Sequence, residues 1–354
     1  MKITDIVCEN RTVSLKRPFK TAVRTVENIE VMDVYVKTDG EIEGYGSATA
    51  SLQVTGDSLK GMRAAVEGPV RDALLNEDVQ KLNHQLIKLE KSCIHNSSAK
   101  AAVDIALHDA YGKHNNLPIY KMLGGERGVL ETDMTVSVDD PDLMKQEAVA
   151  RVREGFDVLK LKVGMDENED FDRLLQVKEA VGENVRLRLD ANQGWTGKQA
   201  VHFLKKIEQE NINVELVEQP VPAHDLKALK YVREHAHVPI MADESAFSPR
   251  EVLRLLEMDC TDYVNIKLMK AGGLRRARQI ADICESAGVP CMIGSMMEST
   301  VSGTAAVHLA MAHPNITMYD LDAPAWMDDE GLKGGMSYEG REVTLNERPG
   351  LGFY

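Results

Sequence analysis

The chain has 354 residues, and at roughly 150 residues per domain this length predicts about two domains. Its 42 basic and 56 acidic residues give a formal net charge of −14, so the average field of the protein repels nucleic acids and anionic membranes. Aromatic residues make up 5% of the chain, which leaves few rings for stacking against bases. We therefore expect neither nucleic acid nor a membrane as a partner.

The cysteines and the hydrophobic segments bear on where the protein works. Five cysteines are odd in number and contain no Cys-x-x-Cys pair, so the sequence predicts neither a disulfide framework nor a zinc knuckle. No stretch of about 18 apolar residues occurs, and the segment after Met1 lacks a continuous hydrophobic run. We expect a cytoplasmic protein without a signal peptide or a membrane-spanning segment.

The first third of the chain predicts a small α+β unit. Three segments have the alternation of strands, and Asp39-Gly40 marks a hairpin turn between the second and the third. The spacing of apolar residues becomes helical over residues 57–117, with the last helix expected at 98–113. The expected strands are residues 3–14, 30–37 and 41–48.

After Gly125 the chain alternates between short apolar runs and amphipathic helical stretches. A single short run does not distinguish a strand from a buried helix, but a regular recurrence favours strands. Eight strands separated by helices predict a βα barrel. The eight runs are residues 132–137, 158–163, 185–189, 214–217, 239–241, 263–266, 291–293 and 316–319.

Most of these runs end in an ionisable residue, and one such residue recurs per βα unit. In a parallel barrel the carboxyl ends of all the strands lie on one face, where active sites are built. We therefore expect these side chains to converge at one mouth of the barrel. They are Lys162, Asp190, Glu218, Asp243, Lys267, Ser295 and Asp320.

Asp190, Glu218 and Asp243 supply three carboxylates from three consecutive strands. Carboxylate oxygens are the ligands that Mg²⁺ prefers when water or substrate fills its other positions. The alternative is that these residues cap helices or lie in solvated loops. That alternative explains one carboxylate better than three carboxylates that recur at the ends of consecutive strands. We assign the three to a divalent metal. Glu244 is expected on the other side of its strand, as a supporting or structural group.

Lys160 and Lys162 are two residues apart in an apolar run, so both side chains are expected on one side of their strand. Lys267 ends a strand on the opposite side of the barrel mouth. Burial, neighbouring ammonium groups and a divalent cation all disfavour a protonated lysine, so we expect a pKa lowered towards that of a general base. One lysine then removes a proton beside a metal-bound carboxylate, and the other returns a proton to the opposite face.

Competing chemistries lack their motifs. No Gly-x-x-x-x-Gly-Lys phosphate loop, His-Glu-x-x-His helix or Gly-x-Ser-x-Gly elbow occurs. Ser295 has no histidine placed to activate it, so we interpret it as a substrate contact and not as a nucleophile. Two-base chemistry needs no redox cofactor.

On these residues the chain resembles the enolase superfamily nearly from end to end. The segment from Lys160 to Lys162, together with Lys267, resembles the muconate lactonizing enzyme subgroup, and the His-Asp base arrangement of mandelate racemase relatives is missing. Asp320-Leu-Asp322 resembles the pair with which dipeptide epimerases bind the α-ammonium group of the substrate. Within that family the chain is most similar to the bacterial L-Ala-D/L-Glu epimerases.

The resemblance implies an α/β fold, a modified TIM barrel of the form (β/α)7β with an N-terminal α+β capping domain. The capping domain is expected at residues 1–124, the barrel at 125–325, and a tail that packs on the capping domain at 326–354. Residues 17–28 and 50–57 are expected to be loops that close over the site and exclude water. The resemblance also implies one Mg²⁺ per subunit and a homo-oligomer.

The resemblance gives each site residue a role. Arg24 pairs with the acidic side chain of the second substrate residue, a task that suits a guanidinium group. The acid/base catalysts are Lys162 and Lys267, the Mg²⁺ ligands are Asp190, Glu218 and Asp243, Lys160 contacts the substrate carboxylate, Asp320 and Asp322 bind the α-ammonium group, and Thr135, Ser295 and Met297 line the dipeptide site.

We therefore expect a Mg²⁺-dependent epimerase that inverts the Cα of the C-terminal residue of a dipeptide, with L-Ala-D/L-Glu epimerisation in murein peptide metabolism as the first choice. Met296 and Met297 form an adaptable apolar wall, so hydrophobic or other charged dipeptides stay open. An N-succinylamino-acid racemase or a muconate cycloisomerase shares the lysines and the metal but does not need Asp320 and Asp322. A non-catalytic metal-binding scaffold is disfavoured by the complete set of lysines and carboxylates.

Overall fold

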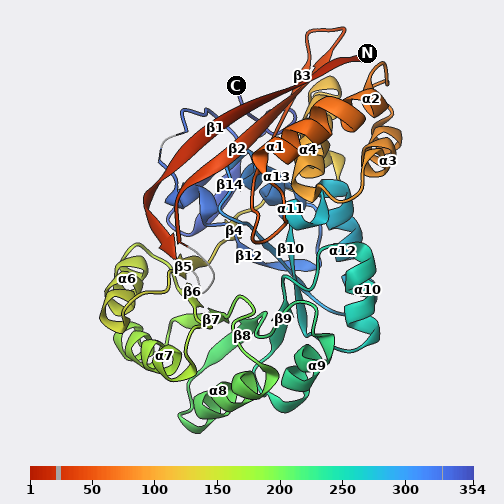
Figure 1. The fold of residues 1–354 in the computed structure, drawn as a ribbon. Coiled ribbons are helices and arrows are strands. Elements are labelled where there is room, and N and C mark those ends of the chain that lie inside the picture. Colours follow the sequence, from red (N-terminus) through yellow and green to blue (C-terminus); the bar gives the residue numbers. More distant parts are fainter. Residues whose placement is uncertain (21–24, 329) are drawn as a thin grey trace.

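The computed structural model describes residues 1–20, 25–328 and 330–354. The chain begins with an antiparallel sheet whose strands pair in the order β1, β2, β3. Figure 1 shows β1 and β2 reaching from the helices of the first third towards β5 of the barrel. These strands are β1 (Ile3–Lys20), β2 (Thr25–Thr38) and β3 (Glu43–Thr49).

The first two strands are longer than predicted. Phe19 pairs with Val26 and Lys20 pairs with Thr25, so the hairpin continues to the tip of the sheet. Residues 17–20 and 25–28, predicted as part of a closing loop, are therefore strand. Lys20 also bonds to the barrel, because its carbonyl accepts the backbone N–H of Val138 at 3.2 Å.

Five α-helices follow the first sheet, and the longest of them, α4, packs on β3. A Cβ atom at Gly46 would come within 2.0 Å of the Ala102 carbonyl oxygen, so glycine allows the helix and the strand to touch. The helices are α1 (Leu59–Ala65), α2 (Arg71–Leu74), α3 (Leu82–Ser92), α4 (Ser97–His114) and α5 (Ile119–Met122), with a π-helical turn at Val66–Val70.

All eight predicted barrel strands are confirmed, and they pair in parallel in sequence order. The segment before β5 lies beside β12, since the Asp133 N–H donates to the Tyr319 carbonyl at 3.1 Å. The strands are β5 (Met134–Val136), β6 (Val158–Lys162), β7 (Arg186–Asp190), β8 (Val214–Glu218), β9 (Ile240–Ala242), β10 (Tyr263–Lys267), β11 (Cys291–Gly294) and β12 (Ile316–Asp320).

Helices separate the strands and surround the sheet (Figure 1). Seven βα units and a final strand make the predicted (β/α)7β arrangement. The helices are α6 (Pro141–Arg153), α7 (Glu167–Val181), α8 (Gly197–Gln209), α9 (Leu226–His235), α10 (Pro249–Glu257), the short α11 (Leu268–Ala271), α12 (Leu274–Ser286) and α13 (Thr300–Ala310).

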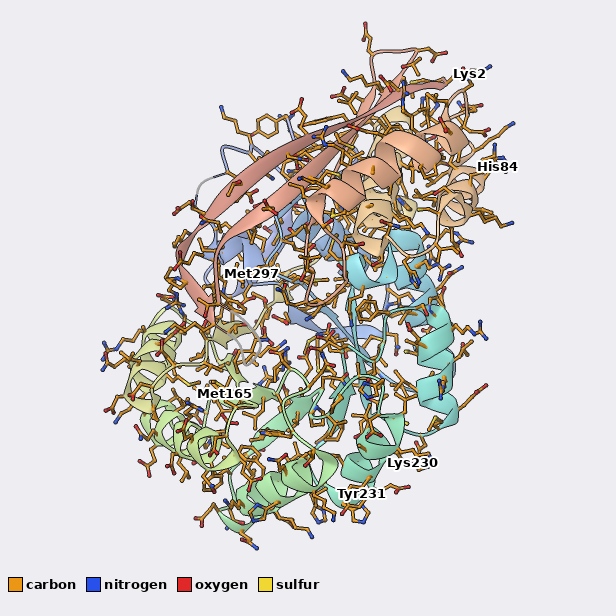
Figure 2. All side chains as sticks on the ribbon, in the orientation of Figure 1. Lys2, His84, Met165, Lys230, Tyr231 and Met297 are labelled. Atoms are coloured by element: carbon orange, nitrogen blue, oxygen red, sulfur yellow. The ribbon has the colours of Figure 1, made fainter. Side chains whose placement is uncertain are left out.

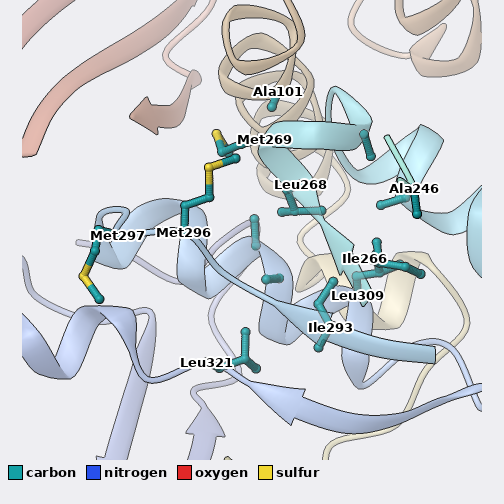
Figure 3. Close-up of a cluster of buried hydrophobic side chains, with 14 of the residues drawn as sticks. Ala101, Ala246, Ile266, Leu268, Met269, Ile293, Met296, Met297, Leu309 and Leu321 are labelled. Atoms are coloured by element: carbon teal, nitrogen blue, oxygen red, sulfur yellow. The ribbon is translucent and has the colours of Figure 1, made fainter. Parts of the chain in front are cut away.

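The core is apolar between the sheet and the helices. Figure 3 shows Ile266 of β10, Ile293 of β11 and Leu309 of α13 meeting in one buried cluster. α13 is buried from Val301 to Ala310, and it also contacts β3 of the first sheet. Among the described helices, none has the length and the apolar character that crossing a membrane requires.

The tail divides between two partners. After the 3-10 turn η2 (Ala323–Trp326), strands β13 (Met336–Glu339) and β14 (Glu342–Leu345) form a small sheet with β4 (Leu130–Glu131). At the start of the tail the Asp328 N–H donates to the Ser14 carbonyl of β1 at 3.0 Å, and near its end the Leu351 N–H donates to Asp109 Oδ1 of α4 at 2.8 Å. The tail thus contacts the first domain at both of its ends, while its strands pair with the segment that leads into the barrel.

Candidate active site

The three predicted metal-binding carboxylates lie at the carboxyl ends of neighbouring barrel strands. Asp190 ends β7, Glu218 ends β8, and Asp243 directly follows β9. Asp190 pairs in register with both Lys162 and Glu218, so these side chains start from one level of the barrel. All are buried.

Lys160 lies at the centre of this group. Its Nζ atom is 3.1 Å from Asp190 Oδ2, 2.7 Å from Glu218 Oε2 and 2.8 Å from Asp320 Oδ2. Burial on its own lowers the pKa of Lys160, but Asp320, Glu218 and Asp190 outweigh burial and raise it well above its usual value. The side chain therefore carries a fixed positive charge between the metal ligands and Asp320.

The two other lysines lie on different sides of the same cavity, which has a volume of about 360 Å³. Lys162 Nζ is 2.6 Å from Asp190 Oδ2, and Lys267 Nζ is 2.9 Å from Asp243 Oδ2. Three strands, β7 to β9, separate the strands that carry them. Each lysine thus contacts a different carboxylate of the predicted metal set.

The groups of the protein itself act on the pKa of Lys267 in opposite directions. Burial lowers its pKa, but the Asp243 carboxylate, helped by Glu218, raises the pKa above its usual value against the opposing charge of Lys160. The prediction of a lowered pKa counted burial, neighbouring ammonium groups and a divalent cation, and it did not count these carboxylates. A proton-accepting Lys267 therefore requires that positive charge from another source offset these carboxylates.

Two residues missed by the sequence analysis hold the carboxylates from behind. Lys270 Nζ lies 2.5 Å from Asp243 Oδ1 and 3.0 Å from the Asn265 carbonyl oxygen. The Asn265 amide donates to Glu218 Oε1 at 2.9 Å. Lys270 follows Lys267 by three residues on the short helix α11, and that spacing is the only signal that the sequence contains.

Glu244 also differs from its predicted place. It lines the cavity and accepts a hydrogen bond of 3.3 Å from the Asn192 amide. Strand β9 ends at Ala242, so the alternation of faces that predicted an outward Glu244 no longer applies there. Burial, and then Asp243, raise the pKa of Glu244 to about 8.

The donor set fits a divalent metal. Glu244 Oε2 and Asn192 Oδ1 are buried and have no hydrogen-bond partner among the described residues. Together with Asp190, Glu218 and Asp243 they give an all-oxygen set, which is the chemistry of Mg²⁺ sites. Within the described ranges, the oxygens of the three carboxylates do not all approach within 4.8 Å of one another, because Lys160 and Lys267 lie between them.

A tighter group of potential ligands lies outside the barrel mouth. Asp282, Glu285 and His313 have ligand atoms within 4.8 Å of one another. However, His313 Nδ1 accepts the Asn315 N–H at 3.2 Å, so its proton sits on Nε2 and points to Asp282 Oδ1 at 3.0 Å. Neither ring nitrogen has a lone pair free for a metal, and we interpret the group as a hydrogen-bonded pair with an exposed glutamate.

The residues predicted to bind substrate line the same cavity. Asp322 Oδ2 accepts the backbone N–H of Thr135 at 2.8 Å, and among the described residues no cation lies within ion-pair distance of Asp322. Burial, and then Asp320, raise the pKa of Asp322. The Ser295 hydroxyl donates to the Asp320 carbonyl at 3.2 Å. Arg24 lies outside the described residues.

The first domain supplies part of the cavity wall. Phe19 of β1 and the segment Gln53–Val54 line it together with Met297 of the barrel. Figure 2 shows Met297 between the first sheet and the barrel. Residues 50–57, predicted to close over the site, thus contribute two of the lining side chains.

Comparison with known proteins places the chain in a family. Residues 2–124 match the mandelate racemase / muconate lactonizing enzyme N-terminal domain, and residues 143–354 match the enolase C-terminal domain-like family. The L-Ala-D/L-Glu epimerase of Clostridium acetobutylicum is 44% identical over 99% of this chain and 98% of that protein. The chain belongs to the dipeptide epimerase family of the enolase superfamily.

Solved structures of this dipeptide epimerase family share the fold. The substrate-liganded L-Ala-D/L-Glu epimerase of Bacillus subtilis, 42% identical, has a TM-score of 0.98 over 100% of this chain and 99% of that one. The Enterococcus faecalis dipeptide epimerase, complexed with Mg and L-Leu-L-Tyr, is 39% identical with a TM-score of 0.96 over 100% and 99%. The predicted family and fold class are confirmed.

Proposed function

We propose that the chain is a Mg²⁺-dependent dipeptide epimerase that inverts the Cα of the C-terminal residue, with L-Ala-L-Glu and L-Ala-D-Glu as its preferred pair. One observation carries the reaction class. Lys162 and Lys267 lie on different sides of one buried cavity, each against a separate carboxylate of the metal set. A carbon held between them can lose a proton on one face and gain one on the other.

Each group in the cavity has a proposed task. Asp190, Glu218 and Asp243 would hold Mg²⁺, which supplies positive charge beside the substrate carboxylate and lowers the free energy of removing the Cα proton. Lys162 and Lys267 take and deliver that proton. Lys160, with its fixed charge, contacts the substrate carboxylate.

Asp320 and Asp322 are the proposed site for the substrate α-ammonium group. Asp320 Oδ2 forms an ion pair with Lys160 Nζ at 2.8 Å. Asp322 carries a raised pKa in a buried site, and an ammonium group placed beside it would stabilise its ionised form. This arrangement favours a dipeptide with a free amino terminus over an N-acylated amino acid.

The choice of an acidic second residue rests on Arg24 and on the relatives at 44% and 42% identity that are L-Ala-D/L-Glu epimerases. A relative at 40% identity, from Enterococcus faecalis, is a hydrophobic dipeptide epimerase. Met296 and Met297 are buried beside the cavity and form an apolar wall, which keeps hydrophobic dipeptides as the second choice for the substrate.

Solvent deuterium exchange tests reaction and substrate together. The protein with Mg²⁺ is incubated in D₂O with a dipeptide library, and mass spectrometry detects deuterium at the Cα of the second residue. We expect the fastest exchange with L-Ala-L-Glu, and none with the Lys162→Ala/Lys267→Ala double variant. Failure of every dipeptide to exchange would overturn the proposal.

A second candidate is N-succinylamino-acid racemisation, because a Bacillus cereus relative at 33% identity over 99% of this chain and 95% of that protein is an N-succinyl-L-Arg/Lys racemase. Its substrate has no free α-ammonium group. Asp322→Ala separates the two functions: a dipeptide epimerase loses dipeptide turnover, whereas a racemase retains turnover of the N-succinyl substrate. A muconate cycloisomerase would likewise have no need for Asp322.

We also propose that the protein works in the cytoplasm on peptides from murein, as a homo-oligomer with one Mg²⁺ per subunit. Its composition and net charge of −14 support a partner that is a small molecule. Size-exclusion chromatography with light scattering measures the oligomeric state, and a monomer would contradict that part of the proposal.

A further inference from the structure

Trp326 lies directly behind the proposed ammonium site. It ends the η2 turn just after Asp322, and its side chain is buried. The indole Nε1–H donates to Asp322 Oδ2 at 3.1 Å, the same oxygen that accepts the Thr135 N–H at 2.8 Å. Two N–H donors from different segments therefore hold one oxygen of this carboxylate.

The other faces of the indole ring contact the first domain. The Phe19 ring meets it edge-on, with centroids 5.1 Å apart and an interplanar angle of 85°. The Arg17 guanidinium carbon lies 4.2 Å from the Trp326 ring centroid. Phe19 also lines the cavity, with Lys162 Nζ 5.9 Å from its ring centroid. Trp326 thus connects the end of β1 to the carboxylate of Asp322.

We infer that Trp326 is a positioning residue for substrate binding: its indole N–H orients Asp322 towards the α-ammonium group, while its ring fixes Phe19 above Lys162. This inference rests on the proposed function. A residue of the tail, outside the barrel strands, then affects the affinity of the site for the amino end of the dipeptide.

The other tryptophan, Trp195, is buried without such a hydrogen bond among the described residues. Trp195 is also buried, with its ring centroid 4.6 Å from that of Phe203. Its Nε1 atom has no hydrogen-bond partner among the described residues. Trp195→Phe is therefore the matched control, because it removes an indole N–H that has no hydrogen-bond partner among the described residues, and Trp195 does not line the cavity.

Trp326→Phe removes the N–H and keeps an aromatic ring. We expect the KM for L-Ala-L-Glu to rise about tenfold, the effect of one hydrogen bond to a charged group, with kcat changed less than about twofold. Trp195→Phe should leave both constants unchanged. A KM for Trp326→Phe equal to that of the wild type would overturn the inference.

A double-mutant cycle with Asp322→Asn separates positioning from a merely structural role. If Trp326 acts through Asp322, Trp326→Phe adds little to the KM in the Asp322→Asn background. Two independent, multiplying effects on KM would contradict the inference. If the wild-type protein exchanges no dipeptide proton, the proposed function is overturned, and this assignment with it. If the wild type exchanges the proton but Trp326→Phe and Asp322→Asn raise KM independently, only the assignment is overturned.

A fluorescence titration tests the inference without altering Trp326. In Trp195→Phe protein Trp326 is the only tryptophan, since the chain has two. We expect its emission to change saturably with L-Ala-L-Glu, and not with the same dipeptide acetylated at its amino group. Emission that stays constant while the dipeptide is turned over would overturn the inference, including in the case where Trp326→Phe does not fold.

Discussion

The Lys270 ammonium group lies 2.5 Å from Asp243 Oδ1 and 2.5 Å from the carbonyl oxygen of the same residue. Lys267 takes the other carboxylate oxygen, Oδ2, at 2.9 Å. Lys270 also lines a separate cavity between the first domain and the barrel helices, away from the lysines of the active site. It therefore fixes the orientation of a proposed metal ligand from outside the cavity that would hold the metal.

We predict that Lys270→Met weakens Mg²⁺ binding about ten- to hundredfold, the range found when a group that orients a metal ligand is removed. Isothermal titration calorimetry with Mg²⁺ measures the change. Removing a positive charge acts in the opposite direction, so a tighter affinity would show that repulsion by Lys270 outweighs its positioning of Asp243.

Lys100→Met is the control for Lys270→Met. Lys100 lines the same cavity, but its ammonium group bonds to the carbonyl oxygens of Glu90 and Cys93, at 3.1 and 2.5 Å. Because it has no contact with Asp243, we expect its Mg²⁺ affinity to equal that of the wild type. A similar loss in both variants would assign the effect to the cavity as a whole.

Single lysine variants should divide the reaction into its two halves. Lys162→Ala and Lys267→Ala are each predicted to lower epimerisation by at least about 10²- to 10⁴-fold, the usual contribution of one acid/base group. Each variant should still exchange deuterium into one epimer, and the two variants into opposite epimers, because the remaining lysine reaches one face of the Cα.

Nuclear magnetic resonance of the Cα proton in D₂O follows both epimers in one sample. Circular dichroism of each variant checks that the fold is intact. Exchange into both epimers by either single variant would contradict a two-base mechanism, and would indicate that one group serves both faces.

The barrel strands could be predicted because each is a short apolar run bounded by helical spacing, as with Val214–Glu218. The site lysines and carboxylates followed from one geometric rule, that parallel strands bring their carboxyl ends to one face. Glu244 did not follow, because it comes after its strand has ended. The alternation of faces applies only while the backbone stays extended and paired.

Residues that act through tertiary contacts left little signal in the sequence. Lys270 is on a helix and Trp326 is in the tail, and each reaches a site carboxylate only because the fold brings the segments together. The effect of Asp243 on the pKa of Lys267 was missed for the same reason: it depends on how close the carboxylate lies, and spacing along the chain does not give that distance.

His308 makes stability depend on pH. It is buried on α13 beside Tyr120, whose backbone N–H donates to His308 Nδ1 at 3.2 Å. Burial lowers the pKa of His308 from 6.5 to about 3. Between pH 6.5 and about pH 3 the unfolded chain binds a proton at His308 that the folded protein does not bind. The free energy of unfolding therefore decreases as the pH falls through this range.

We predict that His308→Gln flattens the pH dependence of the free energy of unfolding below about pH 6.5, where one such group contributes a slope of up to about 1.4 kcal/mol per pH unit. Urea denaturation at several pH values measures this slope. His235→Gln, at an exposed position on α9, should keep the wild-type slope. An unchanged slope in His308→Gln would assign the acid sensitivity to other groups.

Asp104 joins the two domains by capping a barrel helix. It lies on α4, and its Oδ1 atom accepts the N–H of Leu274, the first residue of α12, at 2.7 Å. The residue before Leu274 is Gly273, which offers no side chain to cap the helix, and a Cβ there would come within 2.3 Å of the Asp104 carboxyl carbon. The first domain thus supplies the cap that the barrel sequence lacks.

We predict that Asp104→Ala lowers the free energy of unfolding by about 1–2 kcal/mol, as the loss of a helix cap does. Asp72→Ala, an exposed change on α2, should lower it by less than about 0.5 kcal/mol. Urea denaturation measures both. Gly273→Ala should also lower the free energy of unfolding, and by less in the Asp104→Ala background, because the new Cβ no longer collides with the carboxyl group. An equal decrease in both backgrounds would show that the positive φ of Gly273, and not its contact with Asp104, requires a glycine.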